Sequence, residues 1–110
     1  MPLSEKVRIE IFIPDPPDIA YRDLLEELAA EFSYAFGGCT EFLASGKYNS
    51  SDGFISSDRI KILFSDAPLS WEQDRLILSE YFDLVRRAAH QALPSEEAIL
   101  VSAYPVSHVE

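Results

Sequence analysis

The 110-residue sequence has few of the side chains that build catalytic or metal sites. It contains one cysteine, Cys39, and two histidines, His90 and His108. A single cysteine excludes an intrachain disulfide, which suits a reducing compartment. Cys39 follows a predicted helix C-terminus, where the helix dipole disfavours a thiolate, so we expect it to be structural. Because His90 is expected late in a helix and His108 in the C-terminal tail, we expect neither a catalytic histidine pair nor a metal site.

Positive charge is also scarce in this sequence. Nine lysines and arginines stand against nineteen aspartates and glutamates, which gives a net charge of −10. Affinity for nucleic-acid phosphates and for anionic membrane surfaces comes mostly from Lys and Arg. We therefore expect no nucleic-acid partner and no membrane partner. The acidic surface either maintains solubility or binds a basic protein partner.

Long apolar runs are absent as well. No stretch approaches the roughly 18 apolar residues of a membrane-spanning helix. The segment 1–7 carries a glutamate and lacks the apolar region of a signal peptide, so we expect a cytoplasmic protein. The composition is that of an ordinary globular chain, 47% apolar and 25% charged. It predicts a single domain over residues 1–110, with a folded core over 7–106 and a loose tail over 107–110.

Alternating apolar residues predict four strands, over residues 7–13, 40–48, 58–65 and 98–106. Apolar residues at three- and four-residue spacing predict two helices. The first follows a proline-rich segment, with Asp15 or Asp18 as its N-cap, and ends at Phe36 before two glycines. The second follows the capping box Ser70-Trp71-Glu72-Gln73 and ends at about Leu93.

This order of elements predicts an α+β fold, the ferredoxin-like βαββαβ sandwich. Right-handed crossovers place both helices on one face of a four-stranded antiparallel sheet with strand order 4-1-3-2. We expect the following residues to face the helices: Ile9, Ile11, Ile13, Phe42, Ala44, Ile60, Ile62, Phe64, Ile99, Val101 and Ala103. The opposite, open face would then mix apolar side chains with charges, including a cross-strand pair of Glu10 and Lys61.

The open face is the first candidate site because a fully solvated sheet face should be mostly polar. Its predicted apolar members are Phe12, Leu43, Leu63, Leu100 and Tyr104. They are either ordinary exposed apolar residues or an interface at which a second sheet packs. A homodimer packed sheet against sheet is the expected form of such an interface.

The predicted hairpin over residues 37–66 carries a spaced pattern of glycines. Gly37-Gly38-Cys39-Thr40 is followed by Gly46-Lys47-Tyr48, then by Gly53 and by Asp58 before an apolar strand. This pattern resembles a G-x-T, G-x-aromatic, G, acid hairpin of small uncharacterised bacterial proteins, although those often have Trp and Glu where this chain has Tyr48 and Asp58. The resemblance implies a ferredoxin-like sandwich and no particular chemistry. The glycines alone are also explained by a helix end, a close backbone approach and a turn.

Three further groups of residues are weaker candidates. Phe54 and Ile55, in the predicted loop 49–57, either fold under the loop or contact a partner. Lys47, Tyr48, Trp71 and Glu72 are predicted to line a small pocket at one end of the sandwich, although a tryptophan in the first turn of a helix more often serves packing. The aspartates at positions 52, 58 and 66 are expected around the hairpin but lack the spacing of a calcium loop.

Two functions of different classes are compatible with these patterns. The first is a non-enzymatic protein-interaction module that self-associates through its open sheet face. The alternative is a small ligand-binding protein or enzyme of the dimeric α+β barrel type, in which two sheets enclose an apolar pocket. No residue carries a recognisable catalytic or cofactor motif, so the sequence favours the first and predicts no cofactor.

Overall fold

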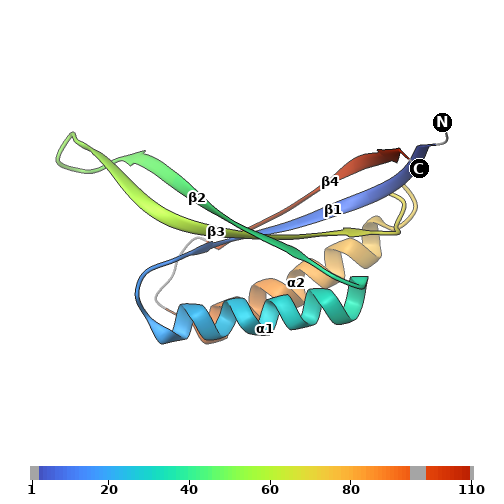
Figure 1. The fold of residues 1–110 in the computed structure, drawn as a ribbon, viewed down its shortest axis with the longest axis horizontal. Coiled ribbons are helices and arrows are strands. Elements are labelled where there is room, and N and C mark those ends of the chain that lie inside the picture. Colours follow the sequence, from blue (N-terminus) through green and yellow to red (C-terminus); the bar gives the residue numbers. More distant parts are fainter. Residues whose placement is uncertain (1–2, 95–98, 110) are drawn as a thin grey trace.

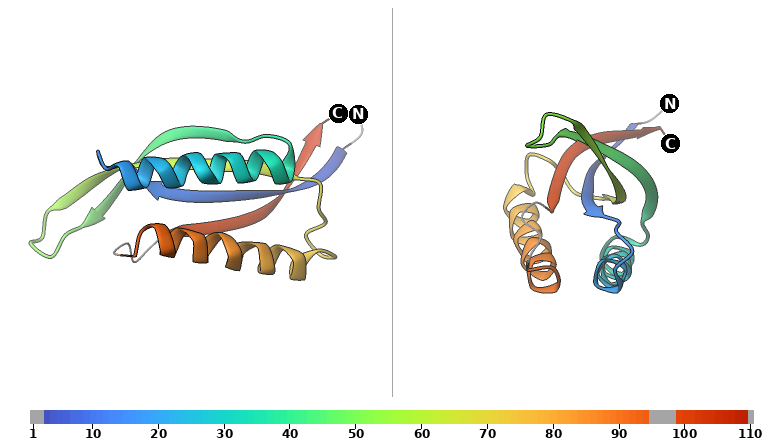
Figure 2. Two further views of the ribbon diagram at one scale, coloured as in Figure 1. Left: turned by 90° about the horizontal axis from the view of Figure 1, so that it is seen from below. Right: turned by 90° about the vertical axis from the view of Figure 1, so that its left-hand side faces the viewer.

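The computed structural model of the chain describes residues 3–94 and 99–109. Its elements follow the order β1 (Leu3–Pro14), α1 (Ile19–Phe36), β2 (Thr40–Asn49), β3 (Ile55–Ala67), α2 (Arg75–Ala92) and β4 (Leu100–Val109). The strands form one antiparallel sheet in the order β2-β3-β1-β4, which is the predicted order. Figure 1 shows both helices beneath this sheet, and Figure 2 shows them side by side under the same face. The predicted ferredoxin-like fold is confirmed.

The core lies between the central strand β1 and the two helices. Val7, Ile9, Ile11 and Ile13 of β1 are all essentially inaccessible to solvent, because every second side chain of a strand points to the same face. The helices contribute Leu24, Leu25, Leu28, Phe32, Leu78, Val85 and Ala89 to the buried apolar side chains, and β3 contributes Leu63 and Ala67. Neither α1 nor α2, the two helices of the described residues, is long and apolar enough to cross a membrane.

The helix termini follow the predicted capping chemistry with one change. The Asp18 carboxylate accepts a hydrogen bond from the backbone N–H of Ala20 at 2.9 Å, and Gly37 ends α1 with a positive φ of 87°. Before α2, the Ser70 hydroxyl accepts from the Gln73 N–H at 3.2 Å, as predicted. The reciprocal acceptor is the Asp74 carboxylate, which takes the Ser70 N–H at 2.8 Å. The helix therefore begins at Arg75, one turn later than the capping box predicts.

The β2–β3 hairpin is longer than predicted and projects beyond the rest of the sheet (Figure 1). Pairing of β2 with β3 continues to Asn49 and Ile55, whereas β1 pairs with β3 only as far as Pro14 and Ile60. Beyond this point the sheet has two strands. The connecting loop is closed by hydrogen bonds from the Ser50 hydroxyl to Asp52 and to the Phe54 carbonyl oxygen, the latter at 2.8 Å. Local side-chain hydrogen bonds of this kind are typical of tight turns.

The outer ends of β1 and β4 also extend further than predicted. Leu3 pairs with Val109, and Ser4 with His108, so β4 continues three residues past the predicted end at Val106. Residues 107–109 of the predicted loose tail are thus strand, because each terminal segment supplies the ladder partners of the other. The predicted first residue of this strand, at position 98, and the last tail residue, at position 110, lie outside the described residues.

The predicted faces of β2 and β3 are wrong. Ile11 pairs directly with Leu63, and directly paired residues share a face, so Leu63 lies on the helix side and is fully buried. Leu43 and Lys61 share that side, and Phe42, Ile62 and Phe64 lie on the open face instead. Both alternating sets of β3 contain large apolar residues, so their periodicity does not decide between the faces.

Candidate functional site

The open face of the sheet carries an apolar row that crosses all four strands. Phe12 of β1 pairs with Leu100 of β4 and with Ile62 of β3, and Ile62 pairs with Phe42 of β2. We call these four residues the apolar row. Leu100 and Phe42, at the two ends, are 57% and 45% exposed, whereas Ile62 in the middle is buried. Neither α1 nor α2 lies over this face (Figure 2).

Phe64 extends the apolar row along the sheet. Its ring packs edge-on against the Phe42 ring, with centroids 6.1 Å apart and an interplanar angle of 71°. The Arg8 guanidinium lies over the Phe64 ring, 4.4 Å from its centroid, at a distance typical of a cation–π contact. Phe64 therefore joins the apolar part of the open face to a polar part built around Arg8.

The polar part consists of charges that are already paired within the chain. Arg8 donates two hydrogen bonds to the Asp66 carboxylate, at 2.8 and 2.9 Å, and His108 Nε2 lies 2.7 Å from the same carboxylate. The Tyr104 hydroxyl donates to Glu10. The Arg8–Asp66 ion pair thus cancels one charge of each sign on the open face, whereas Glu10 keeps its charge and is stabilised by the Tyr104 hydroxyl.

The pairing alters the ionisation of these groups. Hydrogen bonds from Arg8 hold the pKa of Asp66 below its ordinary value; burial opposes this effect and His108 adds to it. The same bonds raise the pKa of Arg8. The hydrogen bond to Glu10 raises the pKa of Tyr104, because ionising the phenol would place two anions side by side. Arg8 and Asp66 are therefore both charged throughout the physiological pH range.

Three of the five predicted interface residues lie on this face: Phe12, Leu100 and Tyr104. The other two, Leu43 and Leu63, lie on the helix side, because the register sets Leu63 opposite Ile11 and Leu43 opposite Lys61. The predicted pair of Glu10 and Lys61 is also wrong, since Glu10 pairs with Phe64 and Lys61 contacts Glu41 at 3.4 Å.

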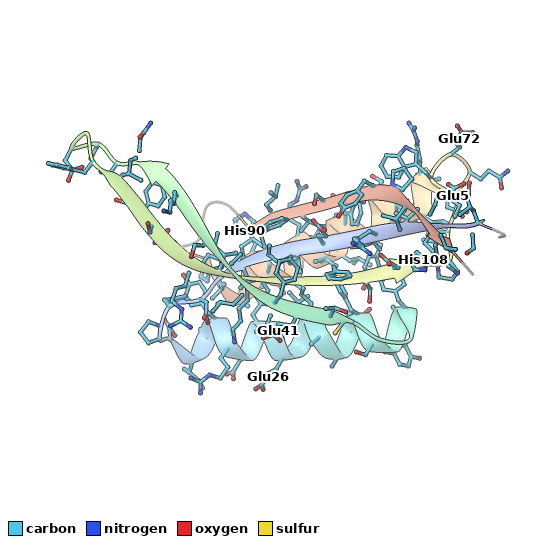
Figure 3. The ribbon with its side chains drawn as sticks, turned by 45° about the horizontal axis from the view of Figure 1, so that its top comes forward. Glu5, Glu26, Glu41, Glu72, His90 and His108 are labelled. Carbon is cyan, nitrogen blue, oxygen red and sulfur yellow. The ribbon has the colours of Figure 1, made fainter. Side chains whose placement is uncertain are left out.

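The predicted loop residues are displayed at the tip of the hairpin. Phe54 is 73% exposed and Ile55 is 70% exposed, so neither folds under the loop. The predicted pocket of Lys47, Tyr48 and Trp71 is not formed. Lys47 and Tyr48 lie near the hairpin tip, whereas Trp71 lies at the opposite end of the sheet, where its backbone N–H donates to the Glu5 carboxylate at 3.2 Å. Figure 3 shows Glu5 and Glu72 together at that end.

The remaining candidate side chains are separated from one another. Cys39 is half-buried, and its thiol lies 3.7 Å from the Ala29 carbonyl oxygen, in a packing position. His90 lies on α2, and His108 is part of β4 rather than of a tail. Asp52 lies in the hairpin loop and Asp66 near the other end of β3, so the predicted cluster of aspartates is absent from the described residues.

The order of elements and the sheet topology place the chain in the class of ferredoxin-like domains. No family model and no curated protein sequence matches it. Among solved structures it is similar to CutA from Synechococcus elongatus PCC7942, with 11% identity and a TM-score of 0.57, over 97% of this chain and 85% of that chain. CutA1 from Oryza sativa gives 12% identity and a TM-score of 0.57, over 97% and 84%.

A PII-like protein is similar over its whole length. The nitrogen regulatory PII-like protein CPII from Thiomonas intermedia K12, whose structure holds ADP, AMP and bicarbonate, is 14% identical, with a TM-score of 0.54, over 99% of this chain and 100% of that chain. At such low identities these similarities show the fold alone.

Proposed function

We propose that this protein is a small, cytoplasmic, non-enzymatic interaction module that self-associates through its open sheet face, with a homodimer as its smallest assembly. The observation that carries the proposal is the apolar row of Phe12, Phe42, Ile62 and Leu100 on a sheet face that neither helix covers. A row of this kind is what one sheet presents to another when two sheets pack face to face. An isologous contact between two copies would bury it on both sides.

The charge distribution supports a second copy as the occupant. A chain with a net charge of −10 repels its own copies wherever acidic surfaces meet. On the open face, Asp66 is paired with Arg8 and His108, and Glu10 accepts a hydrogen bond from Tyr104. Glu10 keeps its charge, but two copies meeting through this face would still oppose fewer acidic side chains than two copies meeting through the outer surface of α1, which carries the exposed Glu26 and Glu27.

Adjacent residues of β2 provide a matched test. Phe42 and Leu43 are both exposed on the same strand, 45% and 57%, but they point to opposite faces. We expect Phe42→Glu to convert the assembly to monomers, because it places like charges within the interface, and Leu43→Glu to leave the mass unchanged. Size-exclusion chromatography with light scattering measures both. An assembly that survives Phe42→Glu, or that dissociates equally with Leu43→Glu, would contradict the proposal.

Contact of the hairpin tip with a further protein is a second part of the proposal. Phe54 and Ile55 lie outside the apolar row, so replacing both with serine should leave self-association intact.

Membership in the family of small bacterial proteins with the G-x-T, G-x-aromatic hairpin is proposed on the residue pattern alone. One of its glycines has a structural explanation, because a Cβ atom at Gly46 would lie 2.6 Å from Ile60 Cδ1.

A further inference from the structure

A cleft of about 380 Å³ lies on the helix side of the sheet, at the base of the projecting hairpin. One wall is the segment Pro14–Pro17 with the first turns of α1, and the other is the helix-facing side of β3. The cleft lies where β1 ends at Pro14 and the β2–β3 hairpin continues past it. It is separate from the open face, so a ligand bound there does not depend on the proposed self-association.

Three of the nine basic residues of this acidic chain line the cleft, namely Arg22, Arg59 and Lys61. Arg59 lies 3.3 Å from Asp15, and Lys61 lies 3.4 Å from Glu41. Each contact uses one donor of a group that has several, so both side chains keep hydrogen-bond donors for a ligand. The Arg22 guanidinium has no ion-pair or side-chain hydrogen-bond partner among residues 3–94 and 99–109.

The charge in the cleft is opposite in sign to that of the whole chain. Of its lining residues, only Asp15 is acidic, against three cations. A concave site with one sign of charge and partly apolar walls concentrates counter-ions of the other sign. Since Arg59 contacts Asp15 and Lys61 contacts Glu41, the excess of positive charge comes from Arg22, and it favours the binding of a small anion in the cleft.

The rest of the lining is apolar and aromatic, and it limits the kind of anion. Pro14, Pro16, Pro17 and Tyr21 form a wall beside the cations. A bare phosphate ion would use the cations but would leave this wall and most of the volume unfilled. We propose that the cleft binds a small phosphomonoester whose non-phosphate part is a flat or apolar ring, with Arg22, Arg59 and Lys61 on the phosphate and the proline-tyrosine wall against the ring.

The test uses phenyl phosphate as the probe, with inorganic phosphate, glucose 6-phosphate and phenol as comparisons. Binding to the full chain is measured by isothermal titration calorimetry and by backbone amide NMR shifts. We expect saturable binding of phenyl phosphate, weaker binding of the other two phosphates, and none of phenol. The NMR shifts should map to Asp15, Arg22, Arg59 and Lys61.

Two exposed helix arginines give a matched pair of variants. Arg22 lines the cleft, whereas Arg87 lies in a basic stretch of α2 with Arg86 and His90. We expect Arg22→Gln to weaken phenyl phosphate binding about tenfold or more, Arg22→Lys to weaken it less, and Arg87→Gln to leave it unchanged. Circular dichroism confirms that each variant is folded.

Several results would overturn the proposal. Equal weakening by Arg22→Gln and Arg87→Gln would show that the acidic chain attracts the anion through scattered basic residues only. Binding of phenol as tight as that of phenyl phosphate would show that the three cations do not contribute to the affinity. NMR shifts confined to the open face would show that the ligand binds there and not in the cleft. Arg22 lies on α1, and the apolar row lies on the sheet face that α1 does not cover. We therefore expect Arg22→Gln to weaken phenyl phosphate binding without changing the solution mass, which distinguishes failure of the cleft proposal from failure of the self-association proposal.

Discussion

Replacement of Leu63 by alanine tests the face assignment on which the candidate site depends. Leu63 is fully buried beside Ile11 on the helix side. The change removes three buried carbon atoms, worth roughly 2.4 kcal/mol at about 0.8 kcal/mol for each methylene group. The cavity left behind adds to this loss, so we expect the free energy of unfolding to fall by about 3 kcal/mol, within the range of ~2–5 kcal/mol for buried leucines. The melting temperature should fall by about 10–20 °C.

The control is Leu43→Ala, because Leu43 is 57% exposed and faces the same side of the sheet. This change should alter the free energy of unfolding by no more than about 0.5 kcal/mol. Urea unfolding followed by circular dichroism measures both variants at several protein concentrations. A loss for Leu63→Ala that is as small as the control, or that appears only at concentrations where the chain self-associates, would put Leu63 at the interface and refute the assignment.

Two further predictions concern the polar part of the open face and the hairpin. Asp66→Asn should lower stability at neutral pH by about 1 kcal/mol, since it breaks the partly exposed pair with Arg8. Because the pKa of Asp66 is depressed in the folded state, this contribution to stability is present at pH values above the ordinary aspartate pKa and is lost as the pH falls. The free energies of unfolding of the parent and the variant should therefore converge at acidic pH. A difference between them that stays constant with pH would contradict the pairing. Gly46→Ala should cost about 1 kcal/mol, because its Cβ atom would overlap Ile60 Cδ1. In an Ile60→Val background, which lacks that atom, thermal unfolding should show little or no cost, and an equal cost in both backgrounds would refute the contact.

The sequence predicted the face of β1 because only one of its alternating sets is apolar. Val7, Ile9, Ile11 and Ile13 alternate with residues that include Arg8 and Glu10, so the pattern has one solution. For β3 the pattern has two solutions, and the pairing with β1 decides between them. The deciding signal in the sequence is size: Ser65 and Ala67 are small and buried where the helices approach, whereas Phe64 needs the open face.

The order of strands could have excluded the predicted pocket. Tyr48 comes just before the hairpin turn, and Trp71 follows the far end of β3. Residues at opposite ends of a 13-residue strand cannot line one small pocket, because each residue advances the strand by roughly 3.3 Å. The cationic cleft could not have been predicted in the same way. It depends on the hairpin continuing past Pro14, and Ile55-Ser56-Ser57 has no apolar alternation that would extend the predicted second strand of the hairpin toward the turn.

The structure also explains why a mixed face is hard to interpret from composition. Arg8, Glu10 and Asp66 look like the charges of a solvated surface, yet Arg8 and Asp66 form an ion pair and Glu10 accepts a hydrogen bond from Tyr104. The same three residues border Phe64 and the apolar row. A face that contains charges can therefore be well suited to association when those charges are already paired.

The most direct test of self-association is the solution mass of the unmodified chain at several concentrations, measured by light scattering on a sizing column. We expect a stable species of at least twice the 12.4 kDa chain mass, because a second copy covers the apolar row. A species of 12.4 kDa that persists at high micromolar concentration would contradict self-association through the open face.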